Sequence, residues 1–171
     1  PQTKKFEKLN LETDVTSAFA LSENNPSIAA YIGQSNHNAG VAYLYDMKKK
    51  TSRLLADPMK PILDEIELGK TEPWNFTASD GTTIQGMMCL PPNFDPNKKY
   101  PLIVYYYGGT TPTERGISNP YCAQLFASRD YVVYVINPSG TIGYGQEFSA
   151  RHVNAWGKRT ADDLSLIHIS E

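Results

Sequence analysis

A run of hydrogen-bond donors follows an apolar stretch near the middle of the chain. Residues 102–107 read Leu-Ile-Val-Tyr-Tyr-Tyr, and Gly108 and Gly109 come directly after them. Glycines let a backbone turn sharply and approach a substrate closely, so that their N–H groups can surround an oxygen that gains negative charge during acyl transfer. The run reads as a buried strand that delivers a tyrosine and two glycines to a functional edge, the layout of an oxyanion-binding turn. The alternatives are an ordinary Gly-Gly turn and, for Tyr107, an aromatic core position.

A nucleophile to match this turn is not found in the sequence. The chain contains no Gly-x-Ser-x-Gly, the sequence that presents a serine on a sharp strand-to-helix turn. Ser139 lies in Pro-Ser-Gly, without that motif or a following helix, and is not predicted to be a nucleophile. His37, His152 and His168 have no metal-ligand spacing. We therefore expect the catalytic serine, acid and histidine to lie outside this chain, and we expect neither a metal nor a cofactor.

The first third of the chain is built from short strand-like segments separated by turn-forming residues. The segments are residues 18–21, 28–33, 41–47 and 52–55. Four antiparallel strands in roughly 40 residues match one blade of a β-propeller, a unit that needs neighbouring blades to bury its faces. We expect residues 1–60 to form the C-terminal blade of a propeller, with further chain before it.

The pattern changes after a proline-containing linker at residues 57–61. A hairpin and two apolar strands are predicted, at residues 74–78 with 83–90, at 102–107 and at 131–136. Asn119 and Pro120 form an N-cap and first-turn pair for a helix between the two apolar strands. Strand, helix and strand at this spacing indicate a βαβ unit in a largely parallel sheet, and hence an α/β fold.

The C-terminal part predicts two helices and an unusual tail. Residues 148–156 form one short amphipathic pattern, which Gly157 ends. Thr160 with Asp163 three positions later fits a capping box for a second helix. Residues 164–171 instead alternate like a strand and resemble the translation of a sequencing-library adapter. We expect the native chain to end at about Asp163 and residues 164–171 to be an adapter-derived tail; a natural terminal strand is the alternative.

Several of these segments resemble the prolyl oligopeptidase family of serine peptidases. Residues 99–109 are similar to the third-strand segment of that family's α/β-hydrolase domain, closest to the dipeptidyl-peptidase IV-like and acylaminoacyl-peptidase-like branches. Residues 137–148 resemble the loop after the next strand, usually Asn-x-Arg-Gly-Ser-x-Gly-Tyr-Gly, although Ser139 stands where arginine is common. Residues 156–163 resemble the segment that leads to the helix before the nucleophile.

This resemblance implies a fold and a reaction. Residues 61–163 would be the N-terminal half of the α/β-hydrolase (peptidase) domain, and the intact enzyme would hydrolyse short peptides through an acyl-enzyme. The Tyr107 hydroxyl and Gly108 would bind the oxyanion, and Tyr144 would belong to a substrate-cleft loop. The chain alone, without the triad, is expected to be inactive. The alternatives are a carboxylesterase-type α/β-hydrolase and a non-catalytic propeller–hydrolase binding protein.

The amino-acid composition limits the kinds of molecule that the protein is expected to bind. The 171 residues have a formal net charge of −2, which gives no reason to expect nucleic-acid binding. No apolar run is long enough to span a bilayer. Cys89 and Cys122 are too few for a disulfide framework, so periplasmic, secreted and cytoplasmic locations stay open. We expect a peptide substrate as partner, and the resemblance is compatible with a homodimer of the full-length enzyme.

Overall fold

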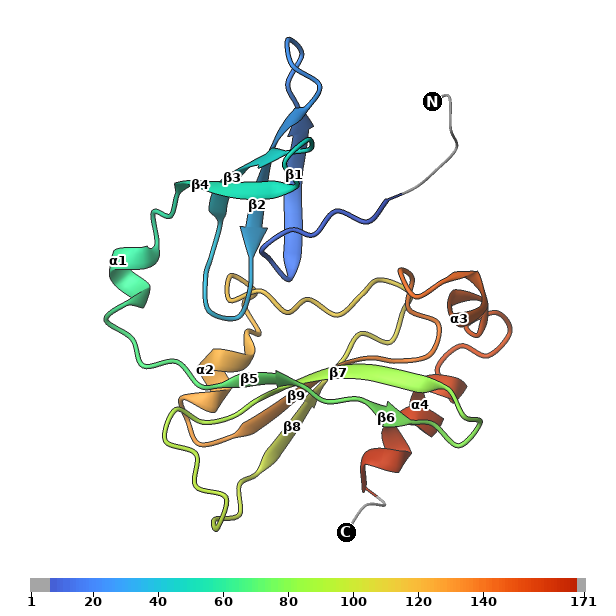
Figure 1. The fold of residues 1–171 in the computed structure, drawn as a ribbon. Coiled ribbons are helices and arrows are strands. Elements are labelled where there is room, and N and C mark those ends of the chain that lie inside the picture. Colours follow the sequence, from blue (N-terminus) through green and yellow to red (C-terminus); the bar gives the residue numbers. More distant parts are fainter. Residues whose placement is uncertain (1–6, 169–171) are drawn as a thin grey trace. The chain divides into compact units, whose positions relative to one another are not determined.

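The chain folds into two compact units. The computed structural model describes residues 7–168 (Figure 1). One unit contains residues up to Ile66 together with 116–118, and the other contains residues 67–115 and those from Asn119 onward. The division falls a few residues after the predicted linker, and the assignment of the two units to a propeller and a hydrolase stays a prediction.

The N-terminal unit is an antiparallel meander in which each strand pairs with the next along the chain. Its strands are β1 (Val15–Leu21), β2 (Ile28–Gln34), β3 (Val41–Asp46) and β4 (Thr51–Ala56). All four predicted strands are present, each within a few residues of its expected bounds. The β2–β3 register places Tyr31 opposite Tyr43, and their rings stack with centroids 5.0 Å apart.

Burial in this unit is concentrated on its two central strands. Ala29, Tyr31 and Tyr45 form its buried cluster, whereas most residues of β1 and β4 are exposed. The expected proline-interrupted linker contains a short helix, α1 (Lys60–Leu63). Pro61 is tolerated there because the first turn of a helix does not need its N–H groups.

The second unit is built on a mixed sheet with the order β5-β7-β9-β8. Its strands are β5 (Thr71–Pro73), β6 (Phe76–Thr77), β7 (Thr83–Cys89), β8 (Leu102–Tyr105) and β9 (Val132–Asn137), and β6 pairs with β7 outside that path. The antiparallel pairing of β6 with β7 confirms the predicted hairpin. Strands β8 and β9 are parallel, as the βαβ pattern requires. The prediction of a largely parallel sheet is wrong for the described residues, because β5, β6 and β9 all pair antiparallel with β7.

The helix α2 (Ala123–Ala127) connects β8 to β9 and covers one face of the sheet. Its Ala123 and Ala127 pack into a buried cluster with Met87, Val133 and Val135. The predicted helix start at Asn119 and Pro120 is wrong. The helix begins after Cys122, because the Asn119 Oδ1 accepts the Tyr121 N–H in a local turn (3.0 Å) instead of capping the helix.

The two apolar strands differ in burial. Residues 133–137 of β9 are buried, as predicted for the second apolar strand. For β8 the prediction of a buried strand extending to Tyr107 is wrong: the strand ends at Tyr105, and Leu102, Tyr106 and Tyr107 are exposed. The reason is its position, since within residues 7–168 β8 pairs only with β9 and forms an edge of the sheet.

The C-terminal helices also differ from their predicted bounds. α3 (Gln146–Ala150) is shorter than the expected helix over 148–156 and is followed by turns. α4 (Lys158–Ser165) begins after Gly157, so Thr160 lies inside the helix and does not cap it. The helix continues into a 3₁₀ turn at Leu166–His168, although the sequence there alternates like a strand. The last three positions of the predicted tail lie outside the described residues, and its adapter origin stays a prediction.

Candidate functional site

The candidate site is formed by two loops that leave the carboxyl ends of parallel strands. One loop follows β8 and contains Tyr107, Gly108 and Gly109; the other follows β9 and contains Tyr144. In open α/β sheets ligands bind at this edge, because the connecting loops leave the sheet there. The structure therefore puts the predicted oxyanion turn and the predicted cleft-loop tyrosine at the same edge.

Thr113 ties the first loop to strand β9. Its hydroxyl accepts the Tyr107 backbone N–H (3.1 Å) and donates to the Ile136 carbonyl (2.7 Å). Its own backbone N–H donates to the Oδ1 of Asn137 (2.7 Å). Thr113 and Asn137 are both buried, so these bonds hold the loop without competition from water.

Asn137 continues the connection to the second loop. Its Nδ2 donates to the Tyr144 hydroxyl at 2.7 Å. A separate backbone bond joins the loops, from the Ile142 N–H to the Thr110 carbonyl (2.8 Å). Tyr107 and Tyr144 thus belong to one hydrogen-bonded assembly. Neither Thr113 nor Asn137 was predicted to act in the site; the position of Asn137 at the end of a buried strand was the available signal.

Tyr107 itself lies over the surface of its own loop. The side chain is 53% exposed, while Gly109 is buried beneath it. A Cβ added to Gly109 would lie 2.6 Å from the Tyr107 Cε1, so the ring can occupy this place only because residue 109 is glycine. At Gly108 an added Cβ would meet nothing within 4 Å, which leaves the turn open above that residue.

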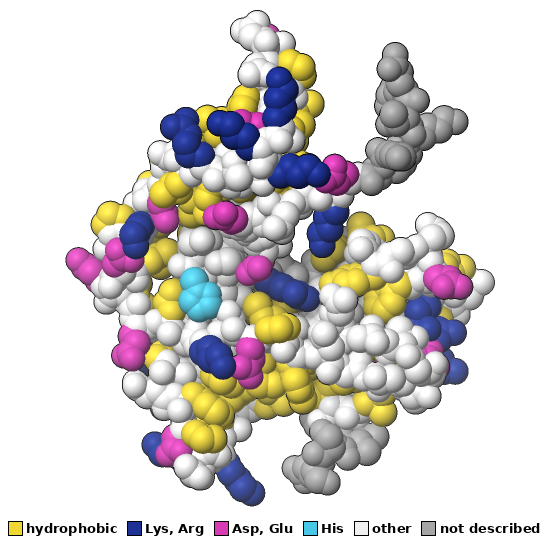
Figure 2. Space-filling view, in the orientation of Figure 1, with side chains coloured by type: hydrophobic (Ala, Val, Ile, Leu, Met, Phe, Trp, Pro, Cys, Tyr) yellow, Lys and Arg dark blue, Asp and Glu magenta, His cyan; other side chains and the backbone are white. Residues whose placement is uncertain are grey.

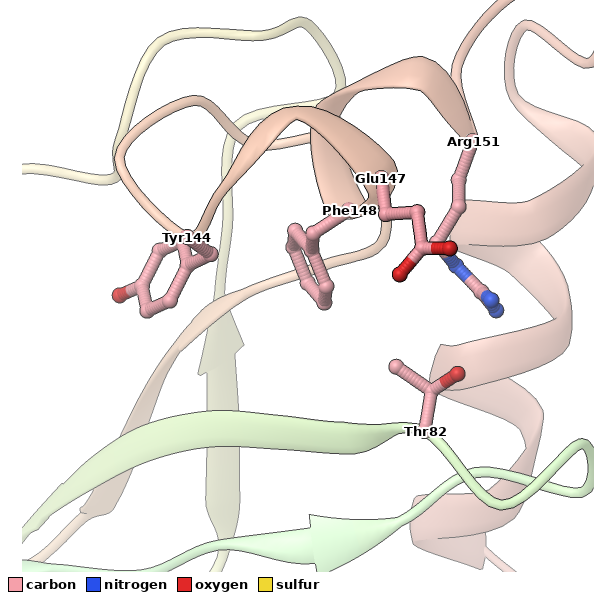
Figure 3. A pocket seen from close by; sticks show the side chains of 5 residues that line it. All are labelled: Thr82, Tyr144, Glu147, Phe148 and Arg151. Carbon is pink, nitrogen blue, oxygen red and sulfur yellow. The ribbon is translucent and has the colours of Figure 1, made fainter.

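A surface pocket of about 480 Å³ lies beside the second loop (Figure 3). It is lined by Thr82, Tyr144, Glu147, Phe148 and Arg151. The Tyr144 and Phe148 rings are 5.2 Å apart, and Figure 3 shows the Glu147 carboxylate and the Arg151 guanidinium on the side away from Tyr144. The pocket therefore has an aromatic end and a charged end.

Charged groups around Ser139 hold the start of the second loop. The Arg151 Nε donates to the Ser139 hydroxyl (3.0 Å), and the Arg151 guanidinium pairs with Asp80. That hydrogen bond lowers the pKa of Asp80 to about 2. The Ser139 backbone N–H donates to the Oδ2 of Asp163 (2.7 Å), a carboxyl whose pKa burial raises. Ser139 is buried and bonded on both sides, which agrees with its exclusion as a nucleophile.

Arg151 and Asp163 were not predicted to act on this loop. Arg151 places a guanidinium next to residue 139, the position where the family pattern has arginine. The sequence predicts Asp163 as part of a capping box, but its side chain turns to the loop instead of to its own helix. In both cases the partners are more than ten residues apart in sequence, and no local spacing marks them.

Other kinds of site are not found in the described part of the chain. Within residues 7–168 no group of three or more histidine, cysteine or acidic side chains is arranged to hold a metal ion. In the same range no helix is long and apolar enough to cross a membrane. Cys89 is buried, and desolvation raises the pKa of its thiol to about 12, so it is a poor nucleophile near neutral pH.

Comparisons with known proteins agree on one family. The pattern of the prolyl oligopeptidase family matches residues 118–168. A probable dipeptidyl-peptidase 5 of Aspergillus terreus is 42% identical over 84 residues, which are 48% of this chain and 12% of that protein. Dipeptidyl-peptidase 5 of Porphyromonas gingivalis is 30% identical over 122 residues, 71% of this chain and 18% of that protein.

A solved structure shares the fold. Acylaminoacyl peptidase of Pyrococcus horikoshii superposes with a TM-score of 0.71 at 24% identity, covering 86% of this chain and 22% of the other. The chain spans less than a fifth of the curated relatives named above. The sequence matches identify the family to which this chain is similar, the prolyl oligopeptidase family, and the shared fold agrees with it.

Proposed function

We propose that this chain is part of a serine peptidase that hydrolyses short peptides through an acyl-enzyme. The serine, acid and histidine are supplied by sequence outside the 171 residues. In the reaction the serine attacks the scissile carbonyl, and the carbonyl oxygen becomes an oxyanion. The Tyr107 hydroxyl and the Gly108 backbone N–H donate to that oxyanion, so the chain contributes half of the active site and has no activity alone.

One observation carries this proposal: the turn after β8 is held rigidly while its donors stay accessible. The Tyr107 backbone N–H is bonded to the buried Thr113, whereas the Tyr107 side chain is half exposed. Donors that are fixed before the reaction stabilise the transition state most, because no reorganisation is needed as charge develops. A tyrosine kept only for core packing would be buried, as Tyr134 is.

The exposed edge of β8 supports the proposal that the hydrolase domain contains more strands than this chain provides. Leu102 exposes a large apolar side chain on this strand, and Figure 2 shows further hydrophobic side chains on the visible face. Apolar side chains along an unpaired edge are typical of a surface that another strand or subunit covers. We propose that the remainder of the hydrolase domain adds to the sheet at β8.

We propose further that the N-terminal meander is one blade of a β-propeller. A blade has four antiparallel strands in chain order, and β1 to β4 have this arrangement. The outer strands β1 and β4 are mostly exposed, as expected for a unit whose faces neighbouring blades would cover. The propeller would restrict access to small or unstructured peptides.

The test is Tyr107→Phe in the full-length enzyme, with Tyr106→Phe as the matched control. Both tyrosines are exposed, so neither change should affect folding. Loss of one oxyanion donor costs about 10²–10³-fold in kcat. We expect that loss for Tyr107→Phe and little change for Tyr106→Phe, measured with a chromogenic dipeptide substrate. Equal rates for both variants would contradict the oxyanion role.

The same enzyme separates the alternative functions. A serine-directed fluorophosphonate probe should label it, and labelling should be absent from a non-catalytic binding protein. A carboxylesterase would instead react with simple esters and leave peptide substrates intact. Peptide cleavage together with probe labelling is the result that we expect.

A further inference from the structure

The buried Asn137 side chain fixes which hydrogen bonds the Tyr144 hydroxyl can make. The Oδ1 of Asn137 faces the Thr113 backbone N–H (2.7 Å), and its Nδ2 faces the Tyr144 hydroxyl (2.7 Å). A backbone N–H can only donate, so the atom of Asn137 that meets it must be the carbonyl oxygen. The NH₂ group is therefore the one that meets Tyr144, and this orientation follows from chemistry and not from an arbitrary choice of amide rotamer.

The consequence concerns the proton of Tyr144. Because the hydroxyl oxygen accepts a hydrogen bond from Asn137, its own proton must point elsewhere. Within residues 7–168 Asn137 is the only group that bonds this hydroxyl. Accepting one bond also polarises the O–H and makes it a better donor. Tyr144 is thus a directed donor at the edge of the sheet where the two loops meet.

We propose that Tyr144 donates a hydrogen bond to a backbone carbonyl of the peptide substrate, and that Asn137 and Thr113 are its positioning residues. This inference rests on the proposed peptidase function. A peptide backbone presents a carbonyl oxygen in every residue, and such an acceptor matches an uncharged donor such as the Tyr144 hydroxyl. The aromatic ring of Phe148 lies 5.2 Å from the Tyr144 ring, on the side away from the hydroxyl (Figure 3), and would contact an apolar part of the peptide.

Thr113 connects the loop of Tyr107 to the loop of Tyr144. Its hydroxyl proton is used by the Ile136 carbonyl, which leaves a lone pair to accept the Tyr107 N–H. Its backbone N–H holds Asn137, and Asn137 holds Tyr144. The oxyanion donor and the substrate donor are therefore positioned by one buried residue, so the distance between them does not vary freely as the loops move.

Asn137→Asp tests the inference with almost no change in shape. One oxygen of the new carboxylate can still accept the Thr113 N–H, but the other can only accept as well. The Tyr144 hydroxyl must then turn and donate to that second oxygen, which removes the donor from the substrate. We expect a rise in KM of about 2- to 12-fold, the range for one neutral hydrogen bond, with a smaller change in kcat.

Tyr144→Phe provides the matched comparison, since its half-buried ring leaves the fold intact when the hydroxyl is removed. We expect the same rise in KM for Tyr144→Phe, and no further rise when the two changes are combined, because both remove one interaction. Additive effects of the two changes, or a normal KM in Tyr144→Phe, would overturn the proposal. If Asn137→Asp does not fold, as judged by thermal unfolding, the KM of Tyr144→Phe still decides.

The outcomes separate this inference from the proposed function. An enzyme that neither cleaves peptides nor reacts with a fluorophosphonate probe would refute the peptidase function itself. An active enzyme in which Tyr144→Phe binds its peptide substrate normally would refute only the role of Tyr144. Because a ground-state contact changes KM and an oxyanion donor changes kcat, the effects of Tyr144 and Tyr107 are also distinguishable.

Discussion

Replacing Gly109 by alanine should displace the Tyr107 hydroxyl while residue 107 itself remains tyrosine. The added Cβ would lie 2.6 Å from Cε1 of the ring, 3.0 Å from Cζ and 3.2 Å from the hydroxyl oxygen. Carbon atoms in contact are about 3.5–4.0 Å apart, so the ring must move by about 1 Å. A displacement of that size in a positioned group can cost about 10²-fold in rate. The ring is 53% exposed, so it can swing toward solvent and the fold should keep its stability.

The assay is steady-state hydrolysis of a dipeptide substrate by the full-length enzyme, with thermal unfolding as the control for folding. We expect Gly109→Ala to lower kcat by about 10- to 100-fold with a nearly unchanged melting temperature. In a Tyr107→Phe background Gly109→Ala should have little further effect. A full additional loss in that background would show that the methyl group acts elsewhere.

Two further predictions concern the sheet and its charged edge. Gly86→Ala should destabilise the second unit by about 1–3 kcal/mol in chemical denaturation, because the new Cβ would lie 2.3 Å from the fully buried Tyr134 ring; unchanged stability would show that the ring has room to move. The pKa of Asp80 is about 2, below its ordinary 3.8, so its pairing with Arg151 should stabilise the fold above pH 3.8 and lose that effect as the pH falls toward 2. Asp80→Asn should therefore lower the melting temperature near neutral pH, and its melting temperature should approach that of the parent protein in acid. Asp162→Asn changes an exposed neighbour and should show no such dependence on pH. A loss of melting temperature that does not depend on pH would rule out the ion pair as the cause.

The sequence predicted most strands because their signals are local. Alternating or continuous apolar runs bounded by turn residues mark β2, β3, β7 and β9, and each is close to its expected bounds. Burial of β8 was predicted wrongly from an equally apolar run. The sequence shows that the side chains of β8 are apolar. Whether they are buried depends on how many strands pair with β8, and the sequence of one strand does not contain that information.

Helix boundaries were predicted less well, because capping residues have competing partners. Asn119 bonds the N–H of Tyr121 in a turn, so the helix starts several residues later than its N-cap signature suggests. Asp163 bonds the Ser139 N–H across the fold rather than its own helix. In each case the side chain can accept from more than one donor, and the surrounding structure decides which one it bonds.

In the candidate site, too, the sequence indicates which residue types could act but not which partners they bond. Tyr107, Gly108 and Tyr144 could be singled out because their chemistry and their positions after predicted strands are visible in the sequence. Thr113 could not, since a threonine in a polar loop has many ordinary roles. Its importance comes from its burial and from its hydrogen bonds, which join Tyr107 to β9 and to Asn137.

The loop after β9 is fixed at its start, and two glycines flank Tyr144 further along it. Asn137 and Ser139 are held by the buried groups Thr113 and Asp163. Tyr144 lies between Gly143 and Gly145, both with φ of 96°, a region that other residues rarely adopt. The glycines allow the backbone to bring Tyr144 over Asn137, and the Asn137 bond then selects one direction for the hydroxyl. A donor prepared in this way loses little entropy when a peptide binds, because its orientation is already set. The two flanking glycines and the buried anchor thus support the proposal that Tyr144 donates a hydrogen bond to a carbonyl of the peptide substrate.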